Sequence, residues 1–189
     1  ASLGAVIYRT TRPHVAVLGR IANTHAYRNV KHFPEAVTYE GVLAVRIDAS
    51  FYFGNVAFLK DTLKRLLAEQ PCEVKAIVIE AASINQLDSS ADTALHELVE
   101  QMREDGVELF FANVRGPVRE VMTRSGFDRL LGADHLTLSM TRAVTKARAY
   151  VASLGMDPKP CSGAADEVPF APPNDPSVSR HPALASSFR

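Results

Sequence analysis

Two adjacent serines, Ser89 and Ser90, stand between Asp88 and Asp92, and hydroxyl groups in such a setting allow two kinds of chemistry. A serine can act as a nucleophile when a histidine is held beside it, or it can accept a phosphate group. The nearest histidine in the sequence, His96, lies six residues beyond Ser90, a rotation of about 240° on a helix. It therefore projects away from Ser90, and a hydrolase triad is excluded. The serine pair remains as a helix cap or as a phosphate acceptor.

The other reactive residues show no spacing typical of a catalytic or metal site. The six histidines have no HExxH or comparable ligand spacing, and the chain contains no GxSxG elbow, no P-loop and no GxGxxG motif. Cys72 and Cys161 lie far apart, so the sequence suggests neither a CxxC metal site nor a disulfide framework, which fits a reducing compartment. We therefore expect a protein that is not an enzyme and that holds no metal or other cofactor.

Size and composition limit the architecture. A chain of 189 residues with 47% apolar residues can bury one ordinary core, which predicts a single domain with tails. Twenty-one basic residues balance twenty-one acidic ones, so we expect no nucleic-acid partner. No apolar run approaches the roughly 20 residues of a membrane-spanning helix, and the N-terminus shows no signal peptide. We expect no membrane span within this chain.

The serine pair lies where a predicted strand passes into a predicted helix. The β-branched run at 75–80 is typical of a strand that is covered on both faces. Over residues 95–102 the apolar residues recur at the spacing of one helix face. Either Asp88 or Ser89 can cap the free N–H groups of the first turn, and Ser89-x-x-Asp92 resembles a capping box with Asp in place of Glu.

The rest of the chain alternates strands with helices. We expect further strands at 15–21, 42–48, 107–112 and 136–138, helices at about 59–67, 117–125 and 141–154, and a polar connection at 22–40. This order predicts an α/β fold, with a single mixed sheet of four to five strands and about four helices mainly on one face. Seven of the eleven prolines lie between Pro158 and Pro182, so we expect residues 155–189 to form a disordered, Pro-rich tail.

Loops that follow parallel strands meet at one end of such a sheet, which is the usual position of a binding surface. Two predicted loops, one starting at Asp48 and one ending at Asp88, belong to this end. Asp48 can cap its loop or contribute to a docking surface. Aromatic residues after a strand usually join the core, but alternation would turn Tyr52 away from its aromatic neighbours. Our candidate partner-contact residues are Asp48, Tyr52, Asn55 and Asp88.

The order of these elements, together with particular residues, resembles the STAS domain. Bacterial anti-sigma factor antagonists share this domain with the cytoplasmic C-terminal region of SulP-type sulfate and anion transporters. The stretch Leu87-Asp-Ser-Ser90 is similar to the family's strand-to-helix signature. The resemblance covers residues 12–154 in the expected order and leaves 1–11 as a linker from an upstream membrane region. Two other stretches that carry the resemblance to the family as a whole are Ala94-Leu95 and Phe111-Ala112-Asn113. Five more stretches resemble plant and algal sulfate permeases in particular: Arg12-Pro13, Val17 to Ile21, Tyr27-Arg28-Asn29, Val45 to Asp48 and Tyr52 to Val56.

This resemblance implies a regulatory and scaffolding domain on the cytoplasmic side of a membrane, and we expect the plasma membrane. The domain would contact the transmembrane domain of the same sulfate transporter or the dimer mate in a homodimer. A kinase and a cytosolic enzyme of sulfur assimilation would be further partners. The alternative is a free-standing partner-switching protein, like the anti-sigma factor antagonists.

The resemblance also implies roles for the serine pair. In the antagonists the second hydroxyl residue of the pattern is phosphorylated, and that position is Ser90 here. In plant sulfate transporters a threonine at the preceding position is implicated, and that position is Ser89. Capping and phosphorylation both remain open, because the resemblance implies phosphorylation whereas capping is the common use of serine at the start of a helix. Ala91 stands where the family usually has glycine, which favours an ordinary helical start.

Overall fold

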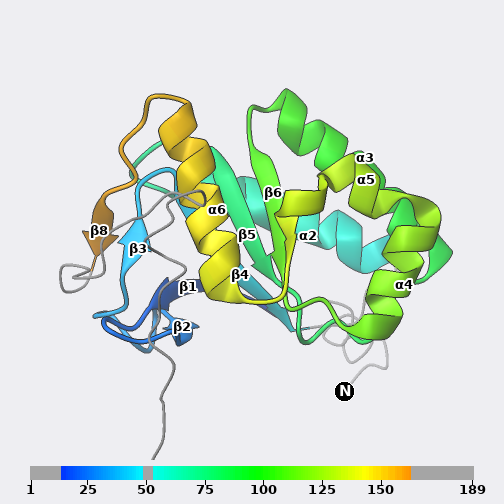
Figure 1. Ribbon diagram of the computed structural model, residues 1–189, viewed down its shortest axis with the longest axis horizontal. Helices are drawn as coiled ribbons and strands as arrows, with labels where there is room; N and C mark the ends of the chain where they lie inside the picture. Colours follow the sequence, from blue (N-terminus) through cyan, green and yellow to red (C-terminus); the bar gives the residue numbers. More distant parts are fainter. Residues whose placement is uncertain (1–13, 49–52, 163–189) are drawn as a thin grey trace, which may run out of the picture.

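The protein alternates strands and helices around one sheet, as Figure 1 shows. The structure is a computed structural model that describes residues 14–48 and 53–162. The strands are β1 His14–Arg20, β2 Tyr27–Asn29, β3 Thr38–Tyr39, β4 Val42–Asp48, β5 Ala76–Glu80, β6 Glu108–Ala112, β7 Leu136–Thr137 and β8 Pro160–Ser162. The helices are α2 Phe53–Ala68, α3 Ser89–Glu104, α4 Gly116–Ser125, α5 Phe127–Leu131 and α6 Met140–Ser153, with a 3-10 turn at Ala133–His135.

The sheet is mixed, as the sequence predicts. Its main path runs β2-β1-β4-β5-β6-β7. Strand β1 is antiparallel to β4, whereas β4, β5, β6 and β7 are parallel to one another. Parallel strands require crossover connections, which helices α2, α3 and α4 with α5 supply. The C-terminal ends of the central strands therefore meet at one end of the sheet, where Glu80 of β5 has Arg46 of β4 and Ala112 of β6 as neighbours.

Strand alternation divides the interior into two cores. On β5, Ile77 and Ile79 belong to the core under α2, α3, α4 and α5, whereas Ala76 and Val78 belong to the core under α6. All four side chains are fully buried. The central strand is thus covered on both faces, which explains its continuous apolar sequence. In Figure 1, α6 lies on one face of the sheet and the other helices lie on the opposite face.

The described residues form eight strands in this sheet, more than the four to five that the sequence predicts. Strands β2 and β3 lie within 22–40, which the sequence pattern marks as a polar connection. Each is only two or three residues long, so a period-two alternation has no room to show. Helix α5, which the pattern also misses, has five residues. The α/β class and the position of most helices on one face are confirmed.

Strand β8 lies in the segment that the composition assigns to a disordered tail. Pro160 pairs with Tyr39 and Ser162 pairs with Thr38, so regular structure continues to Ser162. Composition alone misses this strand because its pairing partner is far away in the sequence. The expectation for the rest of the tail, and that for the linker at 1–11, falls outside the residues that the structure describes.

Gly41 forms the tight turn between β3 and β4 with a backbone φ of 77°, in the left-handed region. A Cβ atom at this position would lie 2.7 Å from Cγ1 of Val151 on α6. The absence of a side chain therefore allows both the turn and its close approach to the helix. Gly155 has a similar φ of 81°, but a Cβ atom there would meet nothing within 4 Å. A comparison of substitutions at the two glycines therefore distinguishes the cost of the left-handed backbone from the cost of the contact with Val151.

We predict that Gly41→Ala lowers the free energy of unfolding by about 2–5 kcal/mol, because it adds overpacking to a left-handed backbone. Gly155→Ala should lower it by about 1–2 kcal/mol, from the backbone alone. Urea unfolding followed by circular dichroism measures both values. Equal losses in the two variants would show that the approach to Val151 contributes nothing.

Candidate functional site

The serine corner, which we define as Asp88, Ser89 and Ser90, lies at the N-terminus of α3. Asp88 is the N-cap, because its Oδ1 accepts a hydrogen bond of 2.7 Å from the backbone N–H of Ala91. Leu87 is buried and anchors the preceding loop in the core. Both serines are exposed. Of the two caps that the sequence allows, the structure selects Asp88, and the serine side chains stand at the surface.

The capping-box interpretation of Asp92 is wrong. Helix α3 begins directly after Asp88, and the side chain of Asp92 turns inward, with 7% of the residue exposed. Its Oδ1 accepts a hydrogen bond of 2.9 Å from Oγ of Ser125, at the end of α4. Nδ1 of His96 lies 2.9 Å from the backbone oxygen of Asp92. Asp92 therefore fastens α3 to α4 and does not reach back to the helix start.

A groove of about 330 Å³ borders the serine corner. One wall is the loop before α3, and the other wall belongs to α4. The lining residues are Asn85, Gln86, Leu87, Asp88, Pro117, Val118 and Val121. A partner that touches the exposed serines can thus also reach apolar side chains of α4.

Asp48, at the end of β4, belongs to the same end of the sheet. Arg46 donates hydrogen bonds to both of its carboxylate oxygens, from Nε to Oδ1 at 3.0 Å and to Oδ2 at 3.3 Å, and from Nη2 to Oδ2 at 3.2 Å. Ser83, in the loop after β5, donates to Oδ1 at 3.2 Å. Exposed pairs of this kind add little stability. Their consequence is geometric, because Asp48 links the end of β4 to the loop that leads to the serine corner.

The two other predicted contact residues have different outcomes. Tyr52 lies outside the residues that the structure describes. Asn55 lies in the first turn of α2 with 3% of its surface exposed, so its side chain belongs to the interior of this chain. The sequence gives no sign of this burial, because asparagine is mostly an exposed residue.

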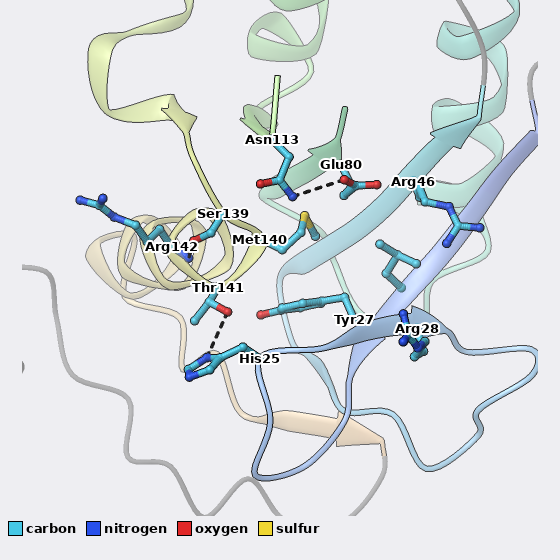
Figure 2. A pocket seen from close by; sticks show the side chains of 11 residues that line it. His25, Tyr27, Arg28, Arg46, Glu80, Asn113, Ser139, Met140, Thr141 and Arg142 are labelled. Carbon is cyan, nitrogen blue, oxygen red and sulfur yellow. Dashed lines mark hydrogen bonds between the residues drawn. The ribbon is translucent and has the colours of Figure 1, made fainter. Parts of the chain in front are cut away.

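A larger cavity of about 600 Å³ lies at the N-terminus of α6, and the sequence does not predict it. Figure 2 shows that β1, β2, the ends of the central strands and α6 surround it. The lining residues are Leu18, His25, Tyr27, Arg28, Arg46, Glu80, Asn113, Ser139, Met140, Thr141 and Arg142. Because they come from separate segments, no local motif marks the cavity. Parts of the family resemblance do fall on it, namely Leu18, Tyr27, Arg28, Arg46 and Asn113.

The polar side chains of this cavity are held by one another. Nδ2 of Asn113 donates to Oε1 of Glu80 at 3.3 Å (Figure 2). Burial, with a smaller effect of the charge of Tyr39, raises the pKa of Tyr27, so its phenol stays neutral. Nδ1 of His25 lies 3.5 Å from Oγ1 of Thr141, the outer limit of a hydrogen bond. The cavity offers donors, acceptors and both signs of charge to a small polar ligand.

Residues 14–48 and 53–162 contain neither a cluster suited to a metal ion nor a membrane-spanning helix. Within these ranges no three His, Cys, Asp or Glu side chains gather as a metal site requires. Within them, too, no helix has both the length and the apolar character needed to cross a membrane. The serine corner with its groove and the polar cavity are the candidate sites for a partner and for a small ligand, respectively.

Residues 33–143, more than half of the chain, match the family model described as the STAS domain. The chain belongs to the STAS-domain family. This STAS domain is 35% identical to "Sulfate transporter 4.1, chloroplastic" of Arabidopsis thaliana over 84% of the chain, and 32% identical to Sulfate transporter 1.2 of the same plant over 76%. It covers 24% and 23% of these two proteins, so it spans about a quarter of the length of the curated relatives it matches.

The STAS domain also resembles solved structures of anion transporters. The murine Solute Carrier 26 family member A9 anion transporter in the inward-facing state matches with a TM-score of 0.69 at 21% identity, over 78% of this chain and 24% of that chain. A second structure, described as SLC26A9, matches with a TM-score of 0.67 at 20% identity, over 80% of this chain and 27% of that chain. At these identities the likeness shows the fold, and it confirms the predicted STAS architecture.

We predict that Asp88→Ala lowers the free energy of unfolding by about 0.5–2 kcal/mol, because the N–H of Ala91 loses its acceptor. Asp88→Ser keeps an acceptor oxygen and should recover most of this loss. Ser89→Ala and Ser90→Ala should each change the free energy by less than about 0.5 kcal/mol. Urea unfolding of the four variants measures the effects. A loss in Ser90→Ala as large as that in Asp88→Ala would contradict the assignment of the cap.

Proposed function

We propose that this chain is the cytoplasmic regulatory and scaffolding domain of a SulP-type sulfate transporter. The observation that carries the proposal is the similarity to plant sulfate transporters, which reaches 35% identity over most of the chain. Because those proteins are about four times as long as the matched region, the domain would work beside a membrane domain and contact it or the dimer mate. This similarity favours the transporter over a free-standing partner-switching protein.

Two membranes are candidate locations for the full-length transporter. A domain of this kind would face the cytoplasm, and the plasma membrane is the location we propose. The relative named chloroplastic makes a chloroplast membrane the competing location. Imaging of a fluorescent fusion of the full-length transporter separates the two.

The serine corner is our candidate for the regulated surface. A phosphate on Ser89 or Ser90 would add about −1.5 to −2 charge near the N–H groups at the start of α3, which favours it. The carboxylates of Asp88 and Asp92 flank the position and oppose it. Both carboxylates already hold parts of the fold, one at the Ala91 N–H and one at Ser125. A phosphate would therefore change what docks on the corner more than it changes the fold.

The groove beside the corner extends the surface on which a partner could dock. Its polar wall ends at Asp88, and its apolar wall is formed by Val118 and Val121 of α4. A kinase would supply the phosphate, and a cytosolic enzyme of sulfur assimilation is the docking partner we propose. Such a partner would meet exposed hydroxyl groups and apolar side chains within one contact area.

We predict that a chimera with this chain in place of the 151 matched residues of Arabidopsis thaliana Sulfate transporter 1.2 carries sulfate in yeast that lacks its own uptake. Uptake is expressed per transporter at the cell surface. The Ser90→Ala and Ser90→Asp variants should then differ in uptake per surface transporter by about fivefold or more, which is the lower range of allosteric couplings. The Ser89→Ala and Ser89→Asp variants are compared in the same way. Thr123→Asp, which adds the same charge at an exposed hydroxyl residue near the end of α4 and outside the lining of the groove, is the control and should leave uptake unchanged.

The outcomes separate the two parts of the proposal. A chimera that reaches the surface and carries no sulfate would contradict the assignment to a sulfate transporter. A working chimera whose serine variants alter uptake only in proportion to surface abundance would contradict the switch and leave the domain assignment standing.

A further inference from the structure

The two cysteines of the chain, far apart in the sequence, line one cavity. Cys72 lies in the loop between α2 and β5, and Cys161 is the middle residue of β8. Both are free and exposed. Both face a recess of about 170 Å³. A thiol pair in one small recess can take part in chemistry that neither thiol could perform alone.

Backbone hydrogen bonds explain why the two segments meet. The N–H groups of Lys75 and Ala76 donate to the carbonyl oxygen of Gly41 at 2.9 and 3.0 Å. The N–H of Glu40 donates to the carbonyl oxygen of Lys159 at 2.8 Å. The turn between β3 and β4 therefore holds the loop that follows α2 on one side and the start of β8 on the other. Both cysteines stand within three residues of these fixed points.

The position of Cys161 leaves room for adjustment. Pro160 and Ser162 pair with Tyr39 and Thr38, and the register shifts between these two partners. Cys161 thus lies at an irregularity of a three-residue edge strand. A disulfide requires Cα atoms about 4.4–6.8 Å apart and a fixed torsion about the S–S bond. A short strand with an irregular register can adjust to that geometry at less cost than a central strand.

The thiols also influence each other electrostatically. Partial burial raises the pKa of Cys161, and negative charge on Glu40 and on Cys72 acts in the same direction. The thiolate is the attacking form in thiol–disulfide exchange. Cys161 therefore suits the second step of such a reaction, in which it attacks Cys72 after Cys72 has formed a mixed disulfide.

We propose that Cys72 and Cys161 form a redox-active pair, which a low-molecular-weight disulfide such as oxidised glutathione converts into an intramolecular disulfide. The thiolate of Cys72 attacks one sulfur of the oxidant, forms a mixed disulfide and releases one glutathione thiolate. Cys161 loses its proton to solvent, attacks the sulfur of Cys72 and releases the second thiolate. Two electrons pass from the cysteines to the oxidant, and its two thiolates take up from solvent as many protons as the two cysteines lose, so that it ends as two thiols. The new bond ties β8 to the loop after α2.

The test is a glutathione redox titration of the whole chain. Free thiols are alkylated at each ratio of oxidised to reduced glutathione, and the chain is digested with trypsin without reduction. Trypsin spares the Lys159–Pro160 bond, so the expected cross-linked product joins residues 66–75 to residues 149–180. The chain contains two cysteines in all, so an intramolecular disulfide has one assignment. Cys72→Ser and Cys161→Ser must each abolish the product.

We expect the folded chain to form the cross-link with an equilibrium constant at least about tenfold larger than that of the same chain in denaturant, or about 30 mV for a two-electron couple. Amide hydrogen exchange should also slow by about tenfold in β8 of the oxidised chain, because the strand is pinned. Equal constants in the folded and denatured chains would overturn the proposal. Mixed disulfides with glutathione or disulfide-linked dimers in place of the intramolecular product would overturn it as well.

Discussion

The burial of β5 on both faces is the constraint on which the rest of the structure depends. Ile77, Val78 and Ile79 are completely inaccessible to solvent, so helices must cover both sides of the sheet. The parallel neighbours β4 and β6 can join β5 only through crossovers, and crossovers place the C-terminal ends of all three strands together. Both candidate sites follow from this arrangement. The serine corner lies at the surface on the side of α2 to α5, and the polar cavity lies on the α6 side.

Helix α3 is held firmly at both ends. Its N-terminus has the cap from Asp88 and the inward bond of Asp92 to Ser125. Near its C-terminus, Arg103 donates to Oε1 of Glu108 at 2.6 Å and to the backbone oxygens of Leu130 and Leu131. These bonds join α3 to β6 and α5. These bonds oppose a shift of α3 relative to α4, α5 and β6. We therefore expect a charge added at its first turn to act mainly on the surface around that turn.

The sequence predicts the elements whose pattern is local and long. The range 42–48 of β4 is confirmed to the residue, and α3 follows from its apolar spacing and its Asp-Ser-Ser start. What the sequence misses depends on partners that are distant along the chain. Strand β8 exists because Tyr39 and Thr38 accept it as a neighbour. The burial of Asn55 and the polar cavity likewise arise only when separate segments pack together.

The same reasoning applies to the cysteines. Spacing along the chain argues against any relation between Cys72 and Cys161, because the usual cysteine motifs are local. The fold places them in one recess through the β3–β4 turn, where Gly41 has no side chain. The turn can take this shape because a glycine adopts a positive φ at little cost. Gly41 thus allows the turn at which the loop after α2 and strand β8 meet.

The loop from Glu80 to Asp88 physically connects the two candidate sites. Glu80 lines the polar cavity and accepts a hydrogen bond of 3.3 Å from the N–H of Ala82, while Arg115 donates to the oxygen of Ala82 at 2.7 Å. Ser83 bonds to Asp48. Contact alone does not couple two sites, because coupling requires an element with two arrangements that both sites favour unequally. This loop touches both sites, as does the connection from Asn113 to Pro117, and the loop's few hydrogen bonds are partly exposed.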